Sequence, residues 1–196
     1  MSDESEEHKG VLLVVDDNEM NRDMLSRRLA RRGHDIVTAA DGHQALKAVE
    51  ETRIDIVLLD VNMPGIDGFE TLEQIRRTHS QSDLSVVMVT AKDSSEDIVK
   101  ALKLGANDYV TKPIDFPVVN ARVQTQLTMK RSFEHIQRLE RQLSKQNENL
   151  EEVNRRMRRD LEAAAIVQQS GLPQASPKVS GVQFAWAYQP CSELGG

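Results

Sequence analysis

Three short runs of the sequence are almost wholly apolar, and they restrict what residues 10–117 can fold into. The runs are "VLLVV", "IDIVLLD" and "SVVMVT", and each has the length of one β-strand. A strand buried on one face alternates apolar and polar residues, whereas strands of a parallel sheet covered by helices on both faces are apolar throughout. The runs therefore predict a sheet that is buried on both faces.

Amphipathic stretches separate these runs, and "DIVTA" and "DYVTK" are two further strand candidates. The stretches between strands carry apolar residues at helical spacing, as at Met24, Leu25 and Leu29. This alternation predicts an α/β fold, a doubly wound five-stranded parallel sheet in the flavodoxin-like order 2-1-3-4-5. Ligands of such sheets bind beyond the carboxyl ends of the strands.

Acidic residues stand where two of these strands end. Asp16 and Asp17 follow the first strand, and Asp60 closes the third. Because the first and third strands are neighbours in the expected order, the three carboxylates are expected to share one pocket. Carboxylates this close repel one another unless a cation lies between them, and Mg²⁺ prefers such oxygen ligands. The sequence therefore predicts a magnesium site.

Two further polar residues end the remaining strands of the same layer. Thr90 closes the fourth strand, and Lys112 closes the fifth. A hydroxyl and a fixed cation beside an acidic metal site can neutralise the oxygens of a phosphoryl group. Each residue alone would more often belong to a loop or a helix cap, but the set of five predicts a phosphoaspartate site with one aspartate as nucleophile.

Four motifs carry a resemblance to a known family: "VLLVVDDNEMNR", "DIVLLDVNMPGIDGFE", "VVMVTA" and "GANDYVTKPID". Over residues 10–125 the chain resembles the receiver domain of two-component response regulators. The resemblance implies that Asp60 accepts a phosphoryl group from a histidine kinase or a phosphotransfer protein. It also implies that Asp16, Asp17, Asp60 and the backbone carbonyl of Asn62 hold Mg²⁺.

The same resemblance assigns roles to three residues of the fourth and fifth strands. Thr90 and Lys112 are expected to bind the phosphoryl oxygens, and Tyr109 matches the aromatic switch residue of the family. Lys112–Pro113 matches the family's cis peptide bond, a geometry that is much less costly before proline than elsewhere. Residues 1–9 are expected to form a disordered N-terminus.

A second segment, residues 126–168, shows a seven-residue period. Apolar residues recur at the a and d positions of roughly three heptads, which predicts a coiled-coil linker. Gln146 takes one d position, Asp160 breaks a later one, and the positions beside the stripe are mostly neutral amides. The predicted dimer interface consists of Ile136, Leu139, Leu143, Leu150, Val153 and Met157.

Such an apolar stripe needs a partner, and the simplest one is the same helix of a second copy in a parallel homodimer. Two alternatives remain open at this stage. The helix could instead pack in an antiparallel hairpin, or it could fold back on the receiver domain.

Residues 160–196 resemble the entrance to bacterial metal-dependent serine/threonine phosphatases of the PPM type, on the phrase "DLEAAAIVQQSGLPQASPKVSGVQFAWAYQPCSELGG". Gly171 departs from that family's pattern, and the chain stops just before the position of its first metal-binding aspartate. Residues 169–196 are therefore expected to be the truncated start of a phosphatase domain, without a complete effector active site. The resemblance implies Mn²⁺ or Mg²⁺ in the missing part, and an anti-sigma antagonist as the substrate of the full-length protein.

Two other outputs stay open. The effector domain could bind a regulatory protein without catalysis, or it could be a diguanylate cyclase. A net charge of -6 argues against a nucleic-acid partner. No apolar run approaches the roughly 20 residues of a membrane span, and the polar start is unlike a signal peptide. These features favour a cytoplasmic protein.

Overall fold

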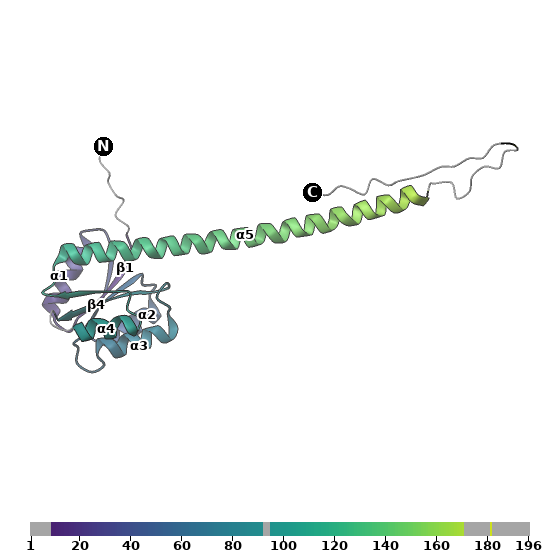
Figure 1. The fold of residues 1–196 in the computed structure, drawn as a ribbon. Helices are drawn as coiled ribbons and strands as arrows, with labels where there is room; N and C mark the ends of the chain where they lie inside the picture. Colours follow the sequence, from purple (N-terminus) through teal and green to yellow (C-terminus); the bar gives the residue numbers. More distant parts are fainter. Residues whose placement is uncertain (1–8, 92–94, 171–180, 182–196) are drawn as a thin grey trace. The chain divides into compact units, whose positions relative to one another are not determined.

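A computed structural model describes residues 9–91, 95–170 and 181 of the chain (Figure 1). The contacts within the chain divide it into two units, Met1–Gln137 and Arg138–Gly196, and each is described here by itself. The expected disordered N-terminus lies almost entirely outside the described residues. The same holds for nearly all of the expected phosphatase segment.

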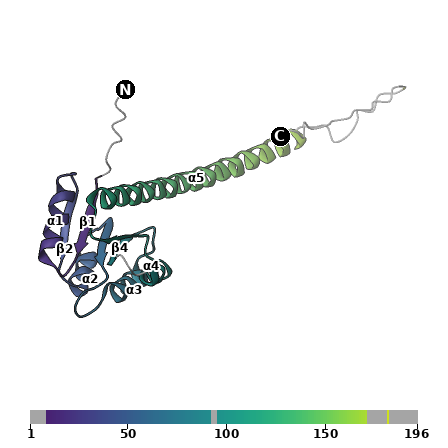
Figure 2. The same cartoon turned by 60° about the vertical axis from the view of Figure 1, so that its left-hand side comes forward.

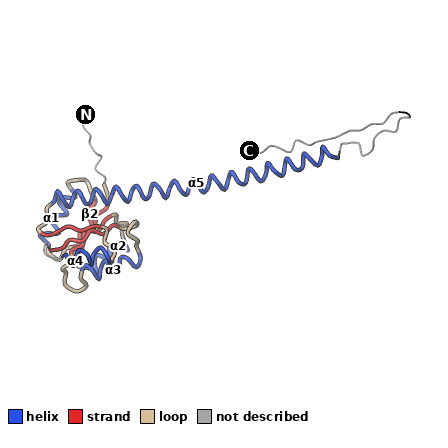
Figure 3. The backbone as a smooth tube through the Cα atoms, in the orientation of Figure 1, coloured by secondary structure: helices blue, strands red, loops and turns tan. Residues whose placement is uncertain are grey.

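The first unit contains one parallel sheet in the order β2-β1-β3-β4-β5. This confirms the expected flavodoxin-like arrangement, with the strands at the centre of the unit (Figure 3, red). The predicted third strand is two residues too long at its start, since Ile54 and Asp55 precede the ladder. The strands are β1 (Val11–Val15), β2 (Asp35–Ala39), β3 (Ile56–Asp60), β4 (Ser85–Ala91) and β5 (Asp108–Lys112).

Helices cover both faces of the sheet (Figures 1 and 2). One core layer joins the sheet to α2, α3 and α4 through side chains such as Ala45, Leu72 and Ala101. The other joins it to α1 and α5 through side chains such as Leu25 and Val123. The helices are α1 (Glu19–Ala30), α2 (Gly42–Glu51), α3 (Gly68–Thr78), α4 (Ser95–Lys103) and α5 (Phe116–Ser170).

Burial follows from this two-layer cover. Every residue of β3 is buried, as are four of the five residues of β1. Alternate side chains of one strand enter opposite layers, so Leu13 lies in the layer of α2 to α4 and Leu12 in that of α1 and α5. The apolar runs are therefore continuous because both faces of the sheet need apolar side chains.

The helix α5 is a single element of 55 residues. Pro117 lies in its first turn, where a missing backbone N–H breaks no helical hydrogen bond. The expected border between receiver and linker, at residues 125 and 126, therefore falls inside one helix. The helix also runs two residues past the expected end of the linker at residue 168. No helix among the described residues is long and apolar enough to cross a membrane.

Candidate functional site

Three carboxylates meet at the carboxyl ends of β1 and β3. One oxygen each from Asp16, Asp17 and Asp60 lies within 4.8 Å of the other two. Asp16 and Asp60 are buried, at 2% and 1% exposure, whereas Asp17 is exposed. The structure thus brings together the three acidic side chains that the sequence predicts for one site.

The strand order places these residues. β1 pairs directly with β3, with Val15 opposite Leu59, so Asp16 and Asp60 leave neighbouring strands in the same layer. The chain then passes into α3, which begins with Gly68 against the end of β3. A Cβ atom at Gly68 would collide with the carbonyl oxygen of Asp60 and come within 2.8 Å of Val61 Cα. Glycine there lets α3 start directly behind the site.

Lys112 joins the cluster from the end of β5. Its Nζ donates to Asp60 Oδ2 at 2.8 Å and to Asp16 Oδ2 at 3.3 Å. The Lys112–Pro113 peptide bond is cis, as the resemblance implies. One ammonium group therefore faces two buried carboxylates, and the third carboxylate lies beside them.

The other expected residues surround this cluster. Thr90 is buried at 2% exposure near the end of β4, opposite Thr111 of β5 and one residue beyond the Asp60 layer. Asn62 is exposed, just past β3. Tyr109 is half-buried and packs against the core layer of α2 to α4.

Two of these groups have shifted pKa values. Burial raises the pKa of Asp60 above its usual value, and the charge of Asp16 adds to this, although the hydrogen bond from Lys112 acts the other way. Burial by itself would lower the pKa of Lys112, but its hydrogen bond and ion pair with Asp60 and the charge of Asp16 raise it. Burial prevails at Asp60 because its side chain is 2% exposed, whereas that of Lys112 is 31% exposed. The site therefore favours additional positive charge.

An unpaired atom indicates where such a charge fits. Asp60 Oδ1 is buried, and among the described residues it has no hydrogen-bond partner. A buried carboxylate oxygen without a partner carries a desolvation cost that a cation or a covalent group would relieve. The donor set of carboxylate oxygens suits Mg²⁺, so the residues present fit this ion.

Sequence reasoning missed the residues that orient Asp16. Asn18 caps α1 by accepting from the amides of Met20 and Asn21, and its own N–H donates to Asp16 Oδ1 at 2.9 Å. Arg22 Nη1 donates to the Asp16 carbonyl at 2.7 Å. The signal available was the Asn18 cap, since an asparagine before an acidic first turn is a frequent helix start.

A cleft of about 540 Å³ lies beside the site and reaches the exposed Asp17 of the acidic cluster. Asp17, Asn62 and Pro64 line it beside the cluster. On its other side the ammonium of Lys100 in α4 lies 4.0 Å from the ring centre of Phe69 in α3.

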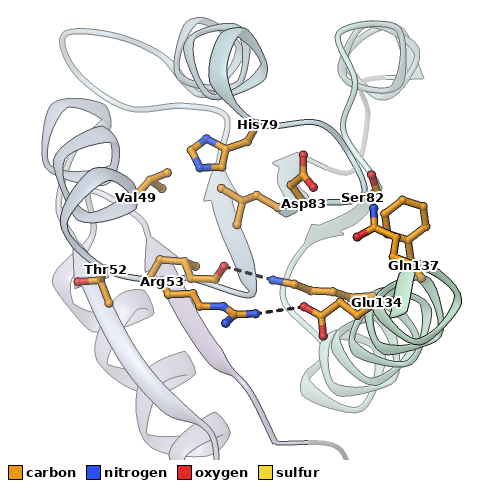
Figure 4. Close-up of a pocket in the computed structure, with 12 residues that line it drawn as sticks. Val49, Thr52, Arg53, His79, Ser82, Asp83, Glu134 and Gln137 are labelled. Atoms are coloured by element: carbon orange, nitrogen blue, oxygen red, sulfur yellow. Dashed lines mark hydrogen bonds and ion pairs between the residues drawn. The ribbon is translucent and has the colours of Figure 1, made fainter. Parts of the chain in front are cut away.

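A second hollow, of about 240 Å³, lies at the amino end of β3 (Figure 4). Three of its charged side chains make close contacts: Arg53 pairs with Glu134 at 3.2 Å, and the buried Lys130 donates to the Ile54 carbonyl at 3.4 Å and to Asp55 Oδ1 at 2.8 Å. These contacts hold the part of α5 that follows its core-packing residues to the loop before β3.

The expected dimer-interface residues all lie on α5, and we call them the seam. Each is between 50% and 59% exposed in the single chain described here. The seam consists of Ile136, Leu139, Leu143, Leu150, Val153 and Met157.

Residues 12–124, more than half of the chain, match the family described as the response regulator receiver domain. The chain therefore belongs to this family. Receiver domains generally bind Mg²⁺ at an acidic site of the kind formed by Asp16, Asp17 and Asp60.

Two curated relatives are similar over the same region. The transcriptional regulatory protein AfsQ1 of Streptomyces coelicolor is 42% identical over 116 residues, covering 59% of this chain and 50% of the relative. The alkaline phosphatase synthesis transcriptional regulatory protein PhoP of Bacillus subtilis is 44% identical over 113 residues, covering 58% of this chain and 46% of the relative. The chain thus spans about half the length of these relatives.

Solved structures share the fold. The receiver domain of the Francisella response regulator 1452 has a TM-score of 0.57 at 28% identity, covering 61% of this chain and 97% of that one. A two-component response regulator with a GGDEF domain has a TM-score of 0.60 at 28% identity, covering 62% of this chain and 50% of that one. The likeness is to the receiver part of the chain.

Proposed function

We propose that this protein accepts a phosphoryl group on Asp60 from the phosphohistidine of a histidine kinase or a phosphotransfer protein. The observation that carries the proposal is the state of Asp60: it is buried, Lys112 binds one of its oxygens, and the other oxygen has no partner in the part of the chain that the structure describes. A carboxylate oxygen attacks phosphorus, the P–N bond of phosphohistidine breaks, and an acyl phosphate forms. The donor would approach from the side of the cleft that Asp17 and Asn62 line.

The surrounding residues would support this transfer. We assign Asp16, Asp17, Asp60 and the Asn62 carbonyl to Mg²⁺, which would neutralise charge on the phosphoryl oxygens. Lys112 holds a second positive charge at the same place, and the Thr90 hydroxyl would donate to a phosphoryl oxygen. We propose that Tyr109 is the switch residue and that its side chain moves together with that of Thr90. The kinases of such relays act in the cytoplasm, and we place the protein there.

The test is phosphorylation of the purified chain by acetyl phosphate with Mg²⁺, followed on a phosphate-affinity gel. We expect one modified species, and we expect its loss in Asp60→Asn and on removal of Mg²⁺. Asp83→Asn is the matched control, because Asp83 is an exposed carboxylate that accepts hydrogen bonds from Ser80, away from the acidic cluster. A modified species that persists in Asp60→Asn contradicts the assignment.

We further propose that α5 forms a parallel homodimeric coiled coil through the seam. Six large apolar side chains, half-exposed or more, follow one face of a helix at heptad spacing, and a second copy would cover them. The flanking positions suit an identical helix, because Gln142 would lie near Asn147 of the second copy, and Asn149 near its Asn154. Light scattering would give twice the chain mass if this is correct.

For the full-length protein we propose a PPM-type serine/threonine phosphatase that acts on an anti-sigma antagonist. The resemblance of residues 160–196 supports it. In such an enzyme Mn²⁺ or Mg²⁺ would activate a water. A phosphoserine peptide with Mn²⁺ tests the full-length protein, and no phosphate release would leave the non-catalytic adaptor.

One observation favours a second candidate output. A solved structure with a similar receiver carries a GGDEF domain, which fits the diguanylate cyclase that the sequence left open. The same full-length preparation, given GTP and Mg²⁺, would distinguish the two by forming a cyclic dinucleotide or phosphate from the peptide.

A further inference from the structure

A belt of side-chain amides interrupts the seam of α5 at its middle. Gln146 occupies the d position between Leu143 and Leu150, and its side chain is exposed in the single chain. Its amide neighbours occupy the positions that flank the seam. These neighbours are Gln142, Asn147 and Asn149.

We propose that Gln146 sets the orientation and register in which two copies of α5 pair. The inference rests on the coiled-coil dimer proposed above, and it names the residue that selects one pairing from several of similar apolar content. The partner is a second copy of this chain.

A parallel pairing in register brings Gln146 opposite itself. In a parallel two-stranded coiled coil each d residue faces the d residue of the other helix. A glutamine amide is both donor and acceptor, so two facing Gln146 side chains can hydrogen bond to each other. This pairing satisfies the polar groups at the only polar d position between Ile136 and Met157.

Other pairings leave the amide unsatisfied. A parallel shift by one heptad places Gln146 opposite Leu139 or Val153. In antiparallel pairs d residues face a residues, and every a position of the seam is apolar, so Gln146 would face Leu143 or Leu150. A buried amide without a partner is costly, and this penalty disfavours each alternative.

The charged residues along the helix do not by themselves select the orientation and register of the pair. In the parallel pair most flanking contacts join neutral amides, with His135 near Glu140 of the second copy as the main exception. Neutral flanks neither attract nor repel strongly, so they distinguish poorly between parallel and antiparallel helices. A single polar residue in an apolar seam is a known means of fixing register, at a cost in stability.

Distance measurement between spin labels tests the inference on the full chain. We would replace the single cysteine by Cys191→Ser and attach the label at Arg155→Cys, an exposed position away from the seam. The parallel pair in register places the two labels at the same height and gives one short distance. An antiparallel pair in which Leu143 faces Gln146 separates the labels by a further ~30 Å along the axis.

In the Gln146 wild-type background we expect the single short distance. Gln146→Leu should add one or more longer distances and lower the dimer dissociation constant about tenfold, because leucine improves the apolar seam but selects no register. Ser144→Leu is the matched control. It adds the same side chain at a b position of the heptad, outside the seam, and should keep the single distance.

The outcomes separate the two levels of the proposal. Light scattering at the mass of one chain overturns the dimer, and the inference with it. A wild-type dimer with several distances, or a Gln146→Leu dimer that keeps one short distance, overturns the role of Gln146 and leaves the dimer standing.

Discussion

The two ends of β3 carry the same pair of residue types in opposite electrostatic settings. At the carboxyl end Lys112 donates to Asp60 at 2.8 Å, and at the amino end Lys130 donates to Asp55 at 2.8 Å. Lys112 also faces Asp16, whereas Lys130 forms an ion pair with one carboxylate among the described residues. The carboxyl end therefore has a surplus of negative charge, and the amino end is balanced.

The pKa shifts of the two aspartates run in opposite directions. Burial raises the pKa of Asp60, and Asp16 adds to the effect. Burial alone would raise the pKa of Asp55 as well, but hydrogen bonds from Lys130 and from the Val11 amide lower it below its usual value. The aspartate–lysine distance is therefore the same at both ends, but the two ends differ in charge. The Asp60 end can take a further cation, whereas the Asp55 end is a complete structural ion pair.

The largest expected effect on stability is at the balanced end. Asp55→Asn leaves the ammonium of Lys130, 8% exposed, without its counter-charge, while the asparagine can still accept from Val11. We expect the free energy of unfolding to fall by about 2 kcal/mol, below the usual cost for a fully buried pair because Asp55 is partly exposed. Urea denaturation at neutral pH measures it. A loss of less than about 0.5 kcal/mol would show the contact to be as weak as a surface ion pair.

The matching substitution at the carboxyl end of β3 should change the free energy of unfolding in the opposite direction. Asp60→Asn removes one of two buried carboxylates that share Lys112, and it leaves the ion pair with Asp16. Without divalent metal we expect the free energy of unfolding to rise by about 1 kcal/mol, because less charge is buried. The same denaturation experiment would contradict this interpretation if Asp60→Asn were as destabilising as Asp55→Asn.

Sequence reasoning found one end of β3 and not the other, and the reason is physical. Asp16, Asp60 and Lys112 follow strands whose order can be predicted, so their meeting could be predicted too. Lys130 lies on α5, 75 residues from Asp55. No strand ladder relates those positions, and only the packing angle of α5 on the sheet brings them together. A lysine among the polar residues of an amphipathic helix gives no sign that it is buried.

The fold itself was largely predictable because continuous apolar strands and capped helices agree with one another. Asp41 caps α2, and Gly33 and Gly105 have φ angles of 86° and 96° at helix ends, where a residue with positive φ is common. The border between receiver and linker was less accessible. The receiver-packing face of α5 passes into the seam without a proline or glycine, so nothing local marks a change within the helix.

The dependence of stability on pH should separate the two ends. The folded pKa of Asp60 lies above the unfolded value of 3.8, so the native state holds the proton more strongly and stability falls as pH rises from 3.8 to the folded pKa. The folded pKa of Asp55 lies below 3.8, so its contribution is present above that value and is lost as pH falls through the folded pKa.

Two difference curves measure these opposite slopes. The stability advantage of Asp60→Asn over wild type should grow as pH rises above 3.8, and the disadvantage of Asp55→Asn should shrink as pH falls below it. Each change should be under about 1 kcal/mol within the range where the chain stays folded. Parallel slopes for the two variants would contradict the difference between the sites.

The smallest effect is expected beside the balanced end, at the exposed ion pair between Arg53 and Glu134. The atoms of this pair lie 3.2 Å apart, and the side chains are 84% and 44% exposed (Figure 4). Water screens such a pair and ordering two long side chains costs entropy, so Arg53→Met should change the free energy of unfolding by less than about 0.5 kcal/mol. Urea denaturation at low and high salt checks it. If Arg53→Met were as destabilising as Asp55→Asn, exposed and buried ion pairs would contribute equally to holding α5 at this place. A small loss instead shows that the Lys130–Asp55 pair contributes more because Lys130 is buried.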